Sequence, residues 1–353
     1  MDIYLCERDT FERLQFVDEY KSIVWTERPN SPGDVVLQLP MTDDWVGFSK
    51  NRFLENSESD EIMIIEERFE TTNEEGENVL EIRGRTLDTL MERRAVIPTR
   101  GKPNWPNYGP IREAVNRLVD DFMLKSTPLG FKNDIIPNLY TYFDINDMQV
   151  YDIALPPQEL YTAIKSLCDS KRFSFGIDLN KTNRRMRFYC KEPNLRNIYF
   201  STQTDTLSNP SFLDSNAGYY NVAYVWSREA KYQVVVGGPN ADVSGVNRRV
   251  LTVDASDLDV DEETTMTQML NQMRQRGREE LAKHRQKRLF DGKVENSDVY
   301  KYRTHYDIGD MVNLIDDRGN TEIVRVTEFI YSQDSEGLRM YPTFTSINEE
   351  GEI

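Results

Sequence analysis

The sequence predicts a mixed, mainly β fold with two β-barrel domains, an inserted α/β domain and one long helix. Three observations predict it. Runs rich in β-branched and aromatic residues, separated by polar turns, occupy both ends of the chain. Apolar residues at helical spacing follow a connector rich in Pro and Gly after about residue 98. A segment that begins at residue 257 runs from acidic to basic residues, which is the charge order that a helix dipole favours.

Residues 1–98 are expected to form the first β-barrel region. In YKSIVWTERPNSPGDVVLQLP, two β-rich runs flank a turn dense in Pro, Asn and Gly, which is typical of a hairpin. A second pair of runs, EIMIIEERFET and NVLEIRGR, is separated by the polar turn TNEEGE. The region therefore starts as antiparallel strands that pair in sequence.

Residues 99–200 are expected to form the inserted α/β domain. After the connector RGKPNWPNYGP, the run IREAVNRLVDDFML places Ile111, Val115, Leu118, Val119 and Phe122 on one face of a helix. A second helix is predicted in PPQELYTAIKSLCDSKR, because paired prolines suit a helix start. The strands RFSFGIDL and RRMRFYCKE follow.

The rest of the chain is expected to complete the two barrels. Strands within 201–256 would complete the first barrel, residues 257–289 would form the long helix, weakened in the middle by Gly277, and residues 290–353 would form the second barrel. A short pattern near the start recurs near the end at identical separations, either by chance or because the two regions are related. The recurring residues are Glu67, Phe69 and Gly76, matched by Glu328, Ile330 and Gly337.

Composition bounds the class of protein. The chain has 353 residues, of which 38% are hydrophobic and 29% charged, so it is a folded protein with room for two or three domains. No membrane segment is expected, and no signal peptide is expected at its acidic start. Three widely separated cysteines are expected to be buried thiols. The net charge of −17 argues against binding to the phosphate backbone of a nucleic acid. The acidic surface either serves solubility alone or lets a polyanion pass without binding.

No catalytic, cofactor-binding or metal-binding residue is predicted, and the chain is expected not to be an enzyme. His284 and His305 are the only histidines and are far apart in the sequence. A catalytic pair of a Ser or Cys nucleophile with a His base is therefore not expected. The glycine-rich piece VVVGGPNADVSG leads into another strand, so it lacks the helix end that binds phosphate. Paired carboxylates of the glycosidase type remain open, because the chain has 60 acidic residues. A carbohydrate-binding or cell-wall-degrading protein, and a host adaptor protein, are therefore the alternatives.

Several segments resemble the hub proteins at the distal end of phage tails, in particular the siphophage tail hub, or baseplate-hub-like, family. The resemblance spans nearly the whole chain and rests on patterns of hydrophobic and turn residues. The strongest combination is IRGRTLDTLMERR with the later GDMV strand. The segments are WTERPNSPGDVVLQLP, EIMIIEERFE, IRGRTLDTLMERRAV, IGDMVNLIDDRG and VRVTEFIYS.

The resemblance implies a homotrimeric ring at the virion tail tip, made in the bacterial host cytoplasm. Such a ring would join a sixfold tail tube or distal tail protein to threefold tip components, contact the tape measure protein and tip or fibre proteins, and let DNA pass without specific binding. Any lytic or receptor activity is expected to reside in another protein. The basic run after Met273 is either a solvated helix face or a binding surface for DNA or a partner. Its candidate contacts between subunits are Arg274, Arg278, Arg285 and Arg288.

Overall fold

The computed structural model describes residues 1–8, 10–41, 47–72, 76–98, 100–125, 135–227, 232–256, 266–294, 299–315 and 321–346. Of the residues described, 47% lie in strands and 18% in helices, so the fold is mainly β. It divides into two compact units: unit 1 holds Met1–Ser208 and Lys293–Phe344, and unit 2 holds Asn209–Gly292 and Thr345–Ile353. Among the residues described, no helix is both long and apolar enough to cross a membrane.

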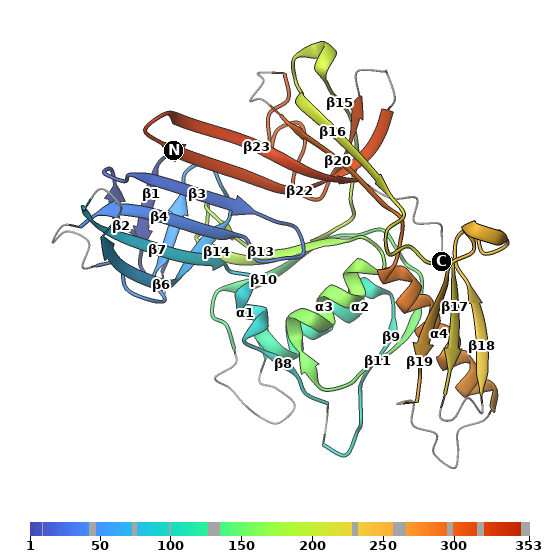
Figure 1. Cartoon of the computed structure of the whole chain (residues 1–353). Helices are drawn as coiled ribbons and strands as arrows, with labels where there is room; N and C mark the ends of the chain where they lie inside the picture. Colours follow the sequence, from blue (N-terminus) through green and yellow to red (C-terminus); the bar gives the residue numbers. More distant parts are fainter. Residues whose placement is uncertain are drawn as a thin grey trace. The chain divides into compact units, whose positions relative to one another are not determined.

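Unit 1 is built on one 11-stranded sheet that takes strands from both ends of the chain. Along the sheet the order is β15-β21-β22-β3-β4-β7-β6-β5-β1-β2, and β23 pairs with β22. Figure 1 shows β22 and β23, in red, side by side as a long hairpin. The strands are β1 (Ile3–Cys6), β2 (Arg13–Val17), β3 (Ser22–Glu27), β4 (Asp34–Pro40), β5 (Phe53–Asn56), β6 (Ile62–Thr72), β7 (Asn78–Thr86), β15 (Leu195–Ser201), β21 (Met311–Ile315), β22 (Thr321–Asp334) and β23 (Gly337–Ser346).

The mainly β fold with an α/β segment between β-rich regions is confirmed. Both predicted hairpins of the first region form: β3 pairs with β4, and β6 with β7. The antiparallel pair β3–β22 joins the first and last β-regions into one sheet, with Phe329 opposite Glu27 and Gln333 opposite Ile23. Closure of each region into a barrel stays a prediction.

The segment between the two β-regions carries helices and short strands that share a core with the first region. Ile111, Val115 and Leu118 are buried, as their helical spacing predicted, and they pack in one cluster with Cys6 and Ile62 of the first region. The second predicted helix begins at Leu160, after the prolines. The elements are α1 (Thr89–Glu92), β8 (Ala95–Val96), β9 (Trp105–Gly109), α2 (Ile111–Val119), a π-helical turn (Asp120–Leu124), β10 (Leu139–Asp144), β11 (Tyr151–Leu155), β12 (Gln158–Glu159), α3 (Leu160–Asp169), β13 (Ser174–Asn180) and β14 (Arg185–Lys191).

Unit 2 is a small α/β unit and corrects two expectations. Strands within 201–256 were expected to complete the first barrel, but β17 (Val222–Trp226), β18 (Gln233–Gly237) and β19 (Val250–Asp254) form a separate three-stranded sheet. The physical reason is their alternating apolar face, which α4 (Met266–Lys283) covers, so these strands have their own core. The remaining strands, β16 (Ser208–Ser215) and β20 (Lys287–Lys293), pair with each other.

The second correction concerns the predicted helix over 257–289. Residues 257–265 lie outside the described part of the chain, and the described helix ends at Lys283. The backbone of the next residue turns toward another segment, because the carbonyl of His284 accepts a hydrogen bond from the amide of Tyr220 at 3.0 Å. Arg285 therefore follows the helix, and Arg288 belongs to β20, whose first residue precedes the predicted start of the second barrel.

The two β-regions of unit 1 share a local pattern at the recurring residues. Gly76 and Gly337 both have positive φ, of 81° and 119°, and each lies between the two strands of a hairpin or at the start of the second strand. The backbone amide of Ile65 donates to the carbonyl of Arg52, and the backbone carbonyl of Ile65 accepts from the amide of Asn51, each at 2.8 Å. Val326 makes the equivalent two backbone bonds: its amide donates to the carbonyl of Asp310, and its carbonyl accepts from the amide of Gly309, each at 2.9 Å. These matches support the predicted relation between the regions.

Candidate functional site

The basic segment that the sequence singled out begins on the exposed side of α4. Met269, Met273 and Leu281 turn toward the sheet of unit 2 and are buried. Arg274 and Arg278 lie on the opposite, exposed side. Arg274 donates to the side-chain oxygen of Asn271, one turn earlier, at 2.9 Å. Both guanidinium groups therefore lie on the surface of unit 2. Arg285 follows the end of the helix and is partly buried.

Gly277 is the point of closest approach between α4 and its sheet. A Cβ atom there would lie 2.8 Å from methyl groups of both Val225 and Val236. The glycine that weakens the helix in isolation is therefore what lets it pack closely on β17 and β18. Its role is in packing.

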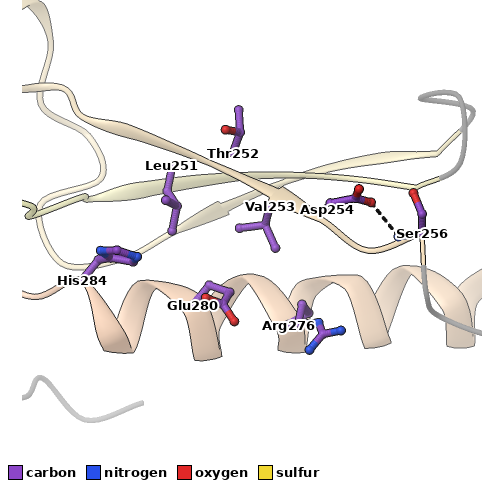
Figure 2. A pocket seen from close by; sticks show the side chains of 8 residues that line it. All are labelled: Leu251, Thr252, Val253, Asp254, Ser256, Arg276, Glu280 and His284. Atoms are coloured by element: carbon purple, nitrogen blue, oxygen red, sulfur yellow. Dashed lines mark hydrogen bonds between the residues drawn. The ribbon is translucent and has the colours of Figure 1, made fainter.

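An open cavity of about 810 Å³ lies between the edge strand β19 and α4 (Figure 2). Arg276 and Glu280 line it from the helix, and Asp254 lines it from the strand. The carboxylate of Asp254 accepts from the amide of Ser256 at 2.8 Å, and the bonds from Ser256 lower the pKa of Asp254. Its lining mixes the apolar side chains of Leu251 and Val253 with polar ones, and the cavity is open to solvent.

Both histidines are held by local contacts. Nδ1 of His284, at the end of the same cavity, lies 3.3 Å from the carbonyl oxygen of Gly218, and its ring packs edge-on against Tyr220. Nδ1 of His305 accepts from the backbone amide of Lys301 at 2.8 Å. Each ring therefore stabilises a turn or helix end, and the two lie in different units.

A buried ionic cluster ties residues 299–310 to the first β-region of unit 1. The carboxylate of Glu27, buried at the end of β3, accepts from the hydroxyl of Tyr302 at 2.6 Å and from the guanidinium of Arg303 at 2.8 Å. Arg303 also donates to Asp60 at 2.7 Å. The ring of Tyr302 stacks on Phe329, with 3.8 Å between centroids. The cluster thus stabilises the place where β3 and β22 join the two β-regions.

Further carboxyl groups lie beside this cluster and are buried. Burial raises the pKa of Asp88 to about 7, although its carboxylate accepts from the amide of Ile177 at 2.6 Å. Burial, and then the nearby Asp88 and Glu27, raise the pKa of Glu61 well above its usual range. Burial also raises the pKa of Asp178, against the effect of Arg187, whose Nε lies 2.9 Å from it.

These buried acids were not predicted, and they do not suit glycosidase chemistry. Only 4% of Asp88 and 7% of Glu61 is exposed, so a glycan cannot reach either carboxyl group. Within the described ranges, no three His, Cys, Asp or Glu side chains are placed to hold a metal ion. Glu27 and Arg303 lie far apart in the sequence, and for that reason no local sequence pattern could predict the cluster.

The cysteines are free and buried, as expected. Burial, with the Glu55 carboxylate nearby, raises the pKa of Cys6 to about 12. The structure also brings the sulfur atoms of Cys168 and Cys190 to 3.7 Å, a proximity that their spacing in the sequence did not suggest.

Comparison with known proteins gives one family and several similar folds. The family model described as "Siphovirus ReqiPepy6 Gp37-like protein" matches residues 2–344. The tail protein from Neisseria meningitidis MC58 superposes with a TM-score of 0.59 at 10% identity, over 98% of this chain and 97% of that chain. Among curated proteins, none matches significantly.

Two prophage proteins have the same fold. The MuSo2 43 kDa tail protein from Shewanella oneidensis has a TM-score of 0.59 at 12% identity and 98% coverage of both chains. The prophage tail protein gp18 from Listeria monocytogenes EGD-e has a TM-score of 0.55 at 10% identity, over 99% of this chain and 96% of that chain. At such low identity these similarities establish the fold alone.

Proposed function

Since the chain belongs to the siphovirus ReqiPepy6 Gp37-like family of phage tail proteins, we propose that it is the hub subunit of the tail tip. Three copies form a ring that joins a sixfold tail tube or distal tail protein to threefold tip components. The ring also contacts the tape measure protein and fibre or other tip proteins. Its role is structural, and DNA passes through its channel without specific binding.

The observation that carries the proposal is the pair of related β-regions joined in one chain. The strand pair β3–β22 links them directly, and the matched hydrogen bonds of Ile65 and Val326 support their equivalence. A ring of three such chains presents six comparable β-regions to a sixfold tube, while the ring itself keeps threefold symmetry. One chain can therefore match the two symmetries.

Charge supports the same role. A chain of net charge −17 can line a channel with carboxylates, which repel the phosphates of the passing DNA. The exposed guanidinium groups of Arg274 and Arg278 are then available for protein neighbours, with Arg285 and Arg288 as further candidates. On this proposal they contact carboxylates of a neighbouring subunit.

Electron cryomicroscopy of the tail that contains this chain tests the proposal. Three copies at one axial level of the tip, around an acidic channel, are expected. One or six copies at that level, or a channel wall dominated by Lys and Arg, would contradict it.

A further inference from the structure

Two of the three cysteines meet inside unit 1. The sulfur atoms of Cys168 and Cys190 lie 3.7 Å apart, at contact distance, and both residues are 0% exposed. Both are free thiols, and they belong to one apolar cluster with Ile164 and Phe175. A disulfide brings two sulfur atoms to ~2.0 Å, so rotation of the two side chains has less than ~2 Å of sulfur–sulfur distance to close.

The backbone around each of the two cysteines is fixed by hydrogen bonds. Cys168 lies in the last turn of α3, where its carbonyl accepts from the amide of Phe173 at 2.9 Å. Cys190 lies in β14, the central strand of a three-stranded sheet, opposite Phe143 of β10 and Phe175 of β13. The fold therefore holds together two thiols that are 22 positions apart in the sequence.

The third cysteine has a different neighbour. Cys6 is equally buried, but its sulfur lies 3.5 Å from a carboxylate oxygen of Glu55. A carboxylate cannot form a cross-link with a thiol by oxidation. Cys6 is therefore an internal control, because it is a buried thiol of the same chain that lies outside the pair.

We propose that Cys168 and Cys190 form a disulfide when the protein leaves a reducing compartment for an oxidising one. The bacterial cytosol keeps thiols reduced, whereas the medium around a released particle does not, and a tail protein meets both. The inference does not depend on the proposed ring.

Dissolved hydrogen peroxide is the oxidant of the reaction. One sulfur atom takes an oxygen atom from the peroxide, which gives a sulfenic acid and one molecule of water. The second sulfur atom then attacks the first, which forms the sulfur–sulfur bond and releases the oxygen as a second molecule of water. The two thiols lose two protons and two electrons in total, and the peroxide is reduced to water.

Burial makes this reaction slow and its product long-lived. Burial, and then the hydrogen bond with Cys190, raise the pKa of Cys168 well above its usual range, so little thiolate is present in the folded protein. Once the bond has formed, the same burial shields it from external thiols. The cross-link also closes the loop between the two cysteines, which stabilises the fold by restricting the unfolded chain.

Alkylation of the purified full chain tests the pairing. Diamide, a small oxidant, takes the same two hydrogen atoms from a pair of thiols and leaves methionine intact. After diamide treatment in buffer, unfolding and alkylation are expected to label Cys6 alone, and trypsin should release the peptide of Cys168 linked to that of Cys190. The reduced protein should be labelled at all three cysteines. The same treatment in urea, which removes the native geometry, should give mixed pairings.

The melting temperature shows whether the bond forms within the native fold. The oxidised wild type should melt ~3–8 °C above the reduced protein. Cys6→Ala keeps the pair and should show the same rise, whereas Cys190→Ala lacks it and should show none. Three labelled cysteines after treatment in buffer, a link to Cys6 as the main product, or an oxidised protein that melts no higher than the reduced one would each overturn the inference. The linked peptides are read from the wild type, so this part of the test does not depend on how either variant folds.

Discussion

Asn51 and Gly309 occupy the same backbone position in the two β-regions, in a left-handed conformation two residues before β5 and β21. Their φ angles are 65° and 83°, and each amide donates to the residue that begins the outer half of the long strand, Ile65 or Val326. Asparagine and glycine are among the residues that adopt this conformation most readily. The shared turn positions the short strand that follows.

The two positions should nevertheless respond differently to substitution. A Cβ atom at Gly309 would lie 2.1 Å from Oγ of Ser174, so Gly309→Ala adds a clash to an unfavourable φ. We expect it to lower the free energy of unfolding by ~2–4 kcal/mol. The control Asn51→Gly keeps the conformation and should stay within about 0.5 kcal/mol of the wild type. Urea unfolding measures both, and a Gly309→Ala variant as stable as the control would contradict the packing described.

Replacing Arg303 should lower the free energy of unfolding far more than replacing an exposed arginine that also pairs with two carboxylates. Arg303→Ala leaves the carboxylate of Glu27, which is 1% exposed, without its cation, and we expect a loss of ~3–5 kcal/mol. Arg339 also pairs with two carboxylates, Asp334 and Glu336, but is 46% exposed. Arg339→Ala should cost at most ~1 kcal/mol. Similar losses in urea unfolding for the two variants would show that the Glu27 cluster is not a stabilising junction.

The contrast between local and distant contacts explains how much could be predicted. The helix at Ile111 and the hairpins β3–β4 and β6–β7 depend on spacing and turn residues that are adjacent in the sequence. The pairing of β3 with β22 depends on which strand edges meet in space, and alternating residues carry no such information. For the same reason β17–β19 could not be distinguished from strands of a barrel.

The candidate site was predicted only in part. Arg274 and Arg278 lie on the exposed face of α4, and their contact with a neighbouring subunit stays a prediction. The amphipathic pattern could not reveal that the helix ends before Arg285, because the carbonyl of His284 bonds a distant amide. The buried acids could not be found either, since 60 acidic residues give no indication of which few are buried.

The isolated protein is expected to leave peptidoglycan and cell-wall glycans intact. The two histidines are held by Gly218 and Lys301, and the clustered carboxyl groups of Glu61 and Asp88 are buried. Incubation with purified cell walls should release no reducing sugar or free amino groups above a buffer blank, with a muramidase as the positive control. Release that one carboxylate substitution abolishes would establish the cell-wall-degrading alternative.

Adding a methyl group at Gly277 should destabilise unit 2. A methyl group there meets Val225 and Val236 at 2.8 Å, which costs ~1–3 kcal/mol of overpacking, whereas alanine regains up to ~1 kcal/mol of helix propensity. We therefore expect Gly277→Ala to lower the free energy of unfolding by ~1 kcal/mol. Gln275→Ala, on the exposed side of the same helix, is the control and should change it by less than about 0.5 kcal/mol. Hydrogen exchange of the α4 amides checks both, and slower exchange in Gly277→Ala would contradict the close approach.

Asp88 should make the protein less stable as the pH rises through neutrality. Burial raises its pKa in the folded chain from the ordinary aspartate value of 3.8 to about 7. A raised pKa means that the folded state binds the proton more tightly, so this stabilisation is complete below pH 3.8 and is lost as the pH rises through 7. Between pH 6 and pH 8 the loss is about 1.4 kcal/mol, the value of a tenfold change in proton binding. In Asp88→Asn this part of the pH dependence is absent, while groups such as Glu55, whose pKa is lowered, act alike in both proteins. Urea unfolding at the two pH values should show the larger fall in the wild type, and equal falls would mean that Asp88 is ionised in the folded protein throughout this range.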